Sequence, residues 1–273
     1  MLTPGRSLAL NIDGGKPLPQ VPAFEALYDM GFAPRHGQVI MIAGRSGSQK
    51  SGLGLFWVAE MNLPTLYFSA DMSAFTASAR LASMATLETT EMVEEGMALG
   101  GHARQKYVDA LAESNITFSF GSPITYRAID EELDAWVELH DAYPEVIVFD
   151  NLMDFEGAEA DYTAQMAVMQ NVTELARYTK ATVIILHHAS DKSMDKNHPW
   201  NPPSRQEVKG GLSEKPELAL SVALEPGTLV YRVAIIKQRM GFNDPTAQTF
   251  AVLQCVPEYT RFEKYRILQP IGH

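Results

Sequence analysis

Short, mainly apolar segments alternate with longer segments of helical periodicity along most of this chain. The apolar segments, predicted as buried strands, are 38–43, 65–70, 115–120, 145–150 and 181–187. The segments predicted as helices are 23–30, 52–61, 74–87, 102–114, 126–141 and 161–180. Strands that are apolar on both faces and alternate with helices indicate a mostly parallel, twisted sheet with helices on both faces. The sequence therefore predicts an α/β fold.

The alternation ends in the last third of the chain. Residues 189–211 combine prolines, glycines and mixed charges, and are predicted to form a long loop. Three further strand candidates, separated by turn residues, predict a C-terminal antiparallel extension of the sheet; they are 218–224, 228–237 and 248–256. Residues 1–22 are rich in proline and glycine and are expected to form an arm or linker, which leaves 23–273 as one domain.

Composition excludes several classes of protein. The 22 basic and 33 acidic residues give a net charge of −11, so any nucleic-acid contact must come from a local basic patch. The single cysteine, Cys255, excludes an intrachain disulfide and a cysteine zinc cluster, and is compatible with a reducing cytosol. No apolar stretch is long enough for a membrane span, and the N-terminus lacks a signal-peptide core. We expect a cytoplasmic protein.

The segment GRSGSQKS lies between a predicted strand and a predicted helix. Such a strand–loop–helix with the pattern G-x-x-x-x-G-K-[ST] cradles phosphates on backbone N–H groups. The residues expected to bind nucleotide are Gly44, Arg45, Ser46, Gly47, Ser48, Gln49, Lys50 and Ser51. Lys50 would reach the β- and γ-phosphates of ATP, and the Ser51 hydroxyl would bind Mg²⁺. The alternative is a Ser/Gly-rich turn that happens to contain a lysine.

Gln49 stands where this pattern has its second glycine. A residue with a β-carbon at that position is expected to crowd the β-phosphate or to strain the backbone. Asp150, at the end of the apolar run EVIVFD, is expected to hold Mg²⁺ together with Ser51. The alternative for Asp150 is a strand-end aspartate that caps a turn.

Further segments, in a fixed order along the chain, carry a resemblance to one known family. They are FEALYDMGFAPRHGQVIMIAGRSGSQKS (Phe24–Ser51), FSADMSAFTASARL (Phe68–Leu81), VIVFDNLMDF (Val146–Phe155), VIILHH (Val183–His188), RQEVKGGLSEKPELALSVAL (Arg205–Leu224) and AIIKQRMGFNDPTAQTF (Ala234–Phe250). Together they resemble the motor domain of DnaB-type replicative helicases and their phage and plasmid relatives. The resemblance implies a RecA-like P-loop NTPase fold. The histidine pair is more like that of the plasmid RepA branch.

The resemblance also implies roles for individual residues. Asp71 falls on the family's catalytic glutamate, which activates the attacking water, although an aspartate is one methylene shorter. The alternative is that Asp71 caps the following helix. His188 falls on the position that senses the γ-phosphate. Lys237 and Arg239 match residues that reach the nucleotide of a neighbouring subunit, and the alternative is a solvated basic sheet edge.

Those neighbour-reaching residues require an oligomer, and the resemblance implies a homo-oligomer, either a hexameric ring or a filament. A ring would present the region around residues 191–215 to single-stranded DNA. Arg205 and Lys209 are the expected DNA contacts, and a charged loop is the alternative. The family's N-terminal collar domain has no counterpart in this chain, so a separate loader or collar protein is a possible partner.

Three functions remain open at this point. The first is an ATP-hydrolysing ring motor on single-stranded DNA in DNA replication. The second is a RecA-like recombination ATPase that forms filaments, which differs from a ring in whether the head-to-tail assembly closes. The third is a catalytically weak nucleotide-binding module with a regulatory or structural role, which Gln49 and Asp71 favour.

Overall fold

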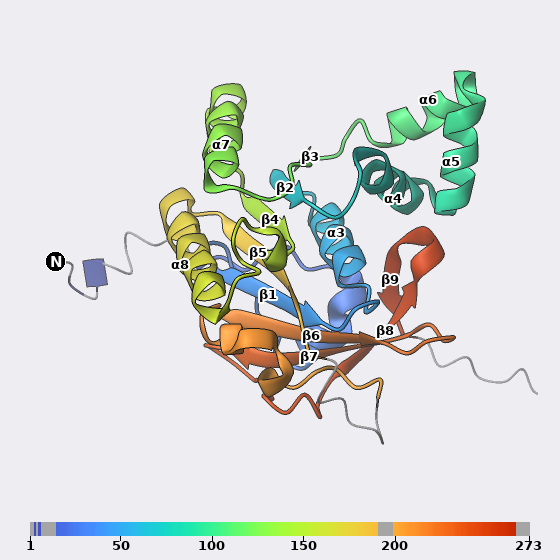
Figure 1. Cartoon of the computed structure of the whole chain (residues 1–273). Helices are drawn as coiled ribbons and strands as arrows, with labels where there is room; N and C mark the ends of the chain where they lie inside the picture. The colour runs from blue at the N-terminus through green and yellow to red at the C-terminus, as the bar shows by residue number, and fades with distance from the viewer. Residues whose placement is uncertain (1–2, 4, 7–14, 191–198, 266–273) are drawn as a thin grey trace, which may run out of the picture.

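The core of the molecule is a nine-stranded sheet in the order β3-β2-β4-β5-β1-β6-β7-β8-β9 (Figure 1). The computed structural model describes residues 3, 5–6, 15–190 and 199–265. The strands are β1 (Val39–Gly44), β2 (Thr65–Ser69), β3 (Ile116–Ser119), β4 (Val146–Asp150), β5 (Thr182–His188), β6 (Leu218–Leu224), β7 (Val230–Gln238), β8 (Ala251–Val256) and β9 (Arg261–Lys264). The strands from β3 to β6 in this order run parallel, and β7, β8 and β9 continue the sheet antiparallel.

Helices cover both faces of this sheet, as the apolar strands require. The α-helices are α2 (Glu25–Asp29), α3 (Lys50–Met61), α4 (Ala74–Thr86), α5 (Thr90–Leu99), α6 (Gly101–Ala110), α7 (Tyr126–His140) and α8 (Tyr162–Thr179). Short 3-10 helices are η1 (Pro22–Phe24), η2 (Leu152–Asp154), η3 (Arg205–Glu207), η4 (Lys209–Glu214) and η5 (Pro257–Tyr259). Helix α3 packs on one face, and α7 and α8 pack on the other (Figure 1). Each face therefore has its own apolar core.

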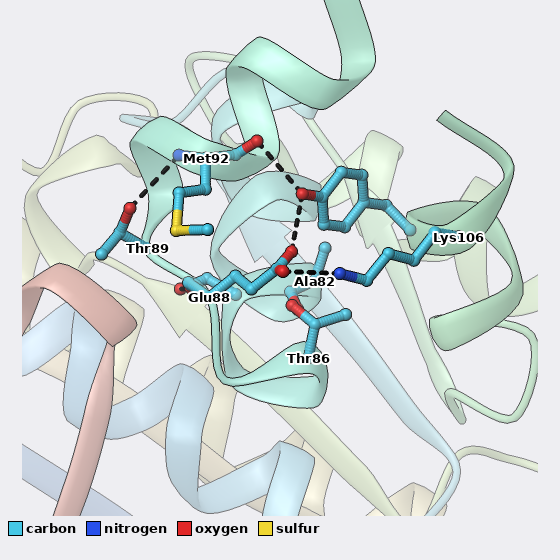
Figure 2. A network of polar contacts seen from close by, with 8 residues as sticks. Ala82, Thr86, Glu88, Thr89, Met92 and Lys106 are labelled. Carbon is cyan, nitrogen blue, oxygen red and sulfur yellow. Dashed lines mark hydrogen bonds and ion pairs between the residues drawn. The ribbon is translucent and has the colours of Figure 1, made fainter. Parts of the chain in front are cut away.

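Helices α4, α5 and α6 form a separate small unit between β2 and β3. Figure 2 shows the polar network that joins them. Glu88, in the turn after α4, accepts hydrogen bonds from the Lys106 ammonium at 2.5 Å and the Tyr107 hydroxyl at 2.7 Å. The Tyr107 hydroxyl also lies 3.1 Å from the carbonyl of Met92 in α5. These contacts tie α6 to both preceding helices.

The structure confirms the predicted α/β class and the antiparallel extension, and it adds elements that the sequence pattern did not predict. Helix α5 and strand β9 were not predicted, and the expected loop 189–211 contains η3 and the start of η4. Helix α5 has glutamates and a glycine among few large apolar residues, which obscures its period. Strand β9 is short, and half of its side chains are exposed.

Part of the expected arm is built into the domain. Leu18 and Val21 are buried in the same core as α3. The Leu18 N–H donates to the Pro34 carbonyl at 3.0 Å, and the Val21 N–H donates to the Tyr28 hydroxyl at 3.0 Å. The packed structure therefore extends before residue 23. Residues 1–2, 4 and 7–14 of the arm lie outside the described residues. Among the helices that the structure describes, none is long and apolar enough to cross a membrane.

Candidate nucleotide site

The loop between β1 and α3 has the close packing that a phosphate cradle requires. A β-carbon on Gly44, the last residue of β1, would lie 2.3 Å from the Ser48 hydroxyl oxygen and 2.9 Å from a Val222 methyl group. Only glycine fits there without a shift of its neighbours. The loop then reaches Lys50, the first residue of α3, which is 8% exposed. The backbone N–H groups of the loop and the N-terminus of α3 therefore lie together at the edge where the parallel strands end.

Gln49 adopts the left-handed conformation, with φ 57° and ψ 28°. The second glycine of the phosphate-loop pattern thus stands where the backbone needs positive φ, and Gln49 takes that conformation at a cost of about 1–2 kcal/mol. The backbone strain predicted for Gln49 is therefore present. The side-chain oxygen of Gln49 lies 3.1 Å from where a β-carbon on Gly52 would be, next to Thr260. Glycine at position 52 therefore makes room for Gln49.

Asp150, the last residue of β4, is joined to this loop. The Ser51 hydroxyl donates to its Oδ1 atom at 3.0 Å, and the Tyr67 hydroxyl donates to its Oδ2 atom at 3.0 Å. Asp150 is 1% exposed, and this burial raises the pKa of its carboxyl group to about 6, against the lowering effect of both hydrogen bonds. Asp150 does not cap a turn, since the side chain of Asn151 caps η2.

These residues fit a magnesium–nucleotide complex. The buried Ser48 hydroxyl has no hydrogen-bond partner among the described residues. Buried polar groups are usually hydrogen-bonded, so this hydroxyl could bond a phosphate oxygen. Ser51 and Asp150 supply the hydroxyl and carboxylate oxygens that Mg²⁺ prefers. A divalent cation would also favour the ionised carboxylate that burial disfavours.

Asp71 lies beside this pair of residues, two positions after β2. Its carboxylate is exposed and accepts a hydrogen bond from the Asn151 side-chain amide at 3.2 Å. It is close enough to Asp150 to contribute to the raised pKa of that group. Asp71 is not the helix cap, because the Ser73 hydroxyl accepts the Thr76 N–H at the start of α4.

The two histidines at the end of β5 face in opposite directions, as neighbours on a strand do. His187 is fully buried and pairs in register with Ala43, and His188 is half-buried and pairs with Gly44. The Ala189 N–H then donates to the Gly44 carbonyl at 3.0 Å. His188 is thus held at the first residue of the phosphate loop, where a γ-phosphate sensor would lie.

Lys237 and Arg239 lie at the opposite edge of the sheet. Gln238, between them, pairs with Leu218 at the start of β6, whereas Gly44 pairs with Val222 near its end. The Lys237 ammonium donates to the Glu214 carbonyl, and an Arg239 guanidinium nitrogen lies 3.7 Å from a Glu217 carboxylate oxygen. Burial, and then the charges of Arg205 and Arg239, lower the pKa of Lys237 to about 8.

The two residues expected to contact DNA lie in consecutive 3-10 helices. Arg205, in η3, lines a cavity of about 630 Å³ together with Glu214, which brings it to the cluster of Lys237 and Arg239. Lys209 is the first residue of η4. The neighbouring residues 191–198 lie outside the described residues.

Arg45, by contrast, contacts a residue that the sequence did not single out. Its guanidinium forms a 2.6 Å ion pair with Glu207 in η3, rather than standing alone over the phosphate cradle. Tyr67, Asn151 and Glu207 are the polar neighbours that sequence reasoning missed. Tyr67 gives no signal, because it is one more aromatic residue in an apolar strand. Glu207 has a signal in the pattern Ser204-x-x-Glu207, a capping box that the structure contains.

Comparisons with known proteins identify a family and related proteins. A family model for AAA domains, AAA_25, matches residues 19–194. The Gene 65 protein of Mycobacterium phage L5 is 30% identical over 263 residues, which cover 94% of this chain and 96% of that protein. The Gene 65 protein of Mycobacterium phage D29 is 28% identical over 231 residues, covering 80% and 95%.

Solved structures share the fold at low sequence identity. A solved ATPase domain matches with a TM-score of 0.76 at 17% identity, covering 95% of both chains. A DnaB-like replicative helicase, described with its interactions with primase, matches with a TM-score of 0.75 at 17% identity, covering 95% of this chain and 67% of that one. The RadB recombinase matches less closely, with a TM-score of 0.55 at 15% identity over 89% and 97%.

Proposed function

We propose a function from one premise: the chain belongs to the AAA-domain family AAA_25 and has the fold of the DnaB-type helicase motor domain. On this proposal the protein is a MgATP-hydrolysing motor that acts on single-stranded DNA in replication. The observation that supports it most is the join between Ser51 and buried Asp150 at the end of the phosphate loop. Burying a carboxylate costs free energy, and a turn that only resembled a phosphate loop would gain nothing in return for that cost.

Within one chain, the site would bind and polarise the nucleotide. Lys50 and the loop N–H groups would neutralise the β- and γ-phosphates, and Ser51 and Asp150 would hold Mg²⁺, which supplies further positive charge to the phosphates. Asp71 would orient and deprotonate the attacking water, with Asn151 fixing its carboxylate. His188, held against Gly44, would respond to the presence of the γ-phosphate.

Turnover would need a second chain. Lys237 and Arg239 lie roughly 13 Å of strand away from their own phosphate loop, since four residues of β6 separate the two registers. A head-to-tail assembly would bring them to the nucleotide of the next subunit, where such cations stabilise the transition state. We propose a hexameric ring that carries Lys209 and Arg205 toward DNA and is served by a separate loader or collar protein.

A second candidate function is a slow nucleotide-binding module. The strained backbone at Gln49 and the short side chain of Asp71 favour it, because a carboxylate misplaced by about 1 Å can cost on the order of 100-fold in rate. A filament-forming recombination ATPase is a weaker candidate, since the RadB match has a lower TM-score than the other two structural matches.

Steady-state ATP hydrolysis separates these candidates. We would measure it with and without single-stranded DNA, over protein concentrations that span monomer to oligomer. The motor predicts turnover that rises with both DNA and protein concentration. Tight MgATP binding without turnover at any concentration would support the regulatory module instead. Electron microscopy of the active sample would then distinguish closed rings from filaments.

A further inference from the structure

The first variable residue of the phosphate loop is bonded to the segment that follows β5. Arg45 forms its ion pair with Glu207 at 2.6 Å, and another guanidinium nitrogen donates to the Asn201 carbonyl at 3.1 Å. The Arg45 and Glu207 side chains are 13% and 16% exposed, so the pair is largely shielded from water. A shielded, well-aligned ion pair holds its geometry better than a surface pair, and removing one partner is costly.

Glu207 also holds together the segment of residues 199–214, which contains η3 and η4. Its second carboxylate oxygen accepts the Ser204 N–H at 2.7 Å, and its carbonyl accepts the Ser190 N–H at 2.7 Å. The next residue, Val208, pairs with Ala189, whose N–H reaches the Gly44 carbonyl. One glutamate thus connects the phosphate loop, the end of β5 and η3.

Arg45 connects the two pieces beside a cavity. The tip of the phosphate loop, at Ser46 and Gly47, lines a cavity of about 440 Å³ together with Trp200 and the end of β6. Of the two polar contacts that the Arg45 side chain makes with the 199–214 segment, the ion pair with Glu207 is the shorter. A displacement of either piece would reach the other through these contacts.

We propose that the Arg45–Glu207 ion pair couples nucleotide occupancy of the phosphate loop to the position of the 199–214 segment, with Glu207 as a positioning residue. This inference rests on the proposed function, because it assumes that the loop binds MgATP. The same segment carries Arg205 and Lys209, so coupling of this kind would connect nucleotide and DNA. Coupling between two ligands is reciprocal: whatever DNA does to ATP affinity, ATP does to DNA affinity.

Amide hydrogen exchange of residues 199–214 tests the coupling without requiring DNA or turnover. We would compare exchange with and without saturating MgADP and the Mg²⁺ complex of a non-hydrolysable ATP analogue. In the wild type, exchange in this segment should slow on nucleotide binding. In Glu207→Gln, which keeps the shape but removes the charge, the segment should no longer respond, although nucleotide still binds.

Glu88→Gln provides the control. Glu88 forms an ion pair with Lys106 at 2.5 Å, with exposures of 22% and 51%, and neither residue belongs to the phosphate loop or to the 199–214 segment. This variant should keep the wild-type response. Calorimetric titration with nucleotide accompanies each variant. If nucleotide does not bind the wild type, the proposed function itself fails; if it binds and Glu207→Gln responds as the wild type does, only the coupling is overturned.

DNA provides a second, functional measurement of the same pair. The ratio of MgATP affinities with and without single-stranded DNA measures the coupling, and ratios of about 5- to 150-fold are typical of linked sites. Glu207→Gln should bring that ratio close to one, with an unchanged affinity for MgATP in the absence of DNA. A purely structural role for Glu207 predicts the opposite: a lower unfolding midpoint with the ratio preserved.

Discussion

The two ends of the sheet's strands, here called its two edges, differ in how their polar side chains are hydrogen-bonded. At the edge where the parallel strands end, Asp150, Ser51 and Tyr67 form a closed set of hydrogen bonds, and the phosphate loop wraps around it. At the other edge, the Lys237 ammonium donates to the Glu214 carbonyl, and Arg239 lies 3.7 Å from the Glu217 carboxylate with a side chain that is 58% exposed. The first edge carries the hydrogen-bonded carboxylate, and the second carries a partly buried lysine and an exposed arginine.

On the proposed function, the two edges would serve the nucleotides of two different chains. A cation that served its own nucleotide would be placed at the edge with the phosphate loop. Cations placed at the far edge can act on a nucleotide only if that nucleotide belongs to another molecule. A head-to-tail assembly, as proposed, would bring the far edge of one chain to the phosphate loop of the next.

Removing Arg239 should have the largest effect on this arrangement. In Arg239→Ala the far edge loses an exposed cation, and turnover in the assembled protein should fall about 10³-fold or more, while MgATP affinity stays within about twofold. Steady-state hydrolysis and calorimetric titration measure the two quantities. Arg127→Ala, which breaks an exposed ion pair within α7, is the control and should leave both unchanged.

A mixing experiment sharpens the same prediction. Lys50→Ala should lack nucleotide binding but keep its far edge, and Arg239→Ala should keep its phosphate loop. In an equal mixture of the two inactive proteins, about a quarter of the interfaces would join an intact phosphate loop to an intact Arg239. Turnover should therefore recover. If the mixture stays as inactive as its components, the two edges do not meet between chains.

Asp150→Asn should weaken function and strengthen the fold. Loss of the carboxylate should lower MgATP affinity about 10- to 100-fold, the range for a lost charged contact. The folded-state pKa of Asp150, about 6, lies above its ordinary value of 3.8, so ionised Asp150 destabilises the unliganded protein at neutral pH. The change should raise the free energy of unfolding at pH 7 by up to about 3 kcal/mol.

The pH dependence gives an independent check on Asp150. Between about pH 4 and pH 6 the folded protein binds this proton more tightly than the unfolded chain, so stability falls as pH rises through that window. Urea unfolding of the wild type and Asp150→Asn, at pH 5 and pH 7.5, should show a larger advantage for the variant at the higher pH. An equal advantage at both values would mean that burial does not raise the pKa of Asp150.

The sequence predicts the positions of residues at the phosphate-loop edge better than the positions of Lys237 and Arg239 at the other edge. The phosphate loop, Asp150 and His188 are local features: a residue that ends a buried parallel strand must lie at the edge with the other strand ends. Whether Lys237 lies near that edge depends on the direction of β7, which follows from pairing with β6 and not from the residues of β7 alone. The partners Tyr67 and Glu207 depend in the same way on the register between distant segments.

Lys237 should make turnover sensitive to alkaline pH. Its pKa of about 8 lies well below the ordinary 10.5, because burial and the nearby Arg205 and Arg239 disfavour the charged ammonium. If the charge acts on the neighbouring nucleotide, turnover of the assembled protein should fall about tenfold per pH unit above pH 8. Lys237→Arg keeps its charge throughout this range and should flatten the profile. A wild-type profile that is level from pH 8 to pH 10 would show that the ammonium is not required.

The smallest expected effect lies within the phosphate loop, where Gln49 and Gly52 share one space. Gln49→Gly removes a strained positive φ and should raise the free energy of unfolding by about 0.5–1 kcal/mol, after the entropy that glycine loses on folding. Nucleotide affinity should change little, because the Gln49 side chain lies along α3 beside Thr260.

Gly52→Ala, made in the wild type and in Gln49→Gly, completes a double-mutant cycle with that substitution. In the Gln49→Gly background, alanine at position 52 meets Thr260 and Phe262 at ordinary contact distances of 3.7 and 3.9 Å, so helix propensity should stabilise the protein by about 1 kcal/mol. In the wild type the new β-carbon lies 3.1 Å from the Gln49 oxygen and that gain should shrink or vanish. Urea unfolding of the four proteins measures the difference, and additive effects would show that the loop accommodates Gln49 without help from Gly52.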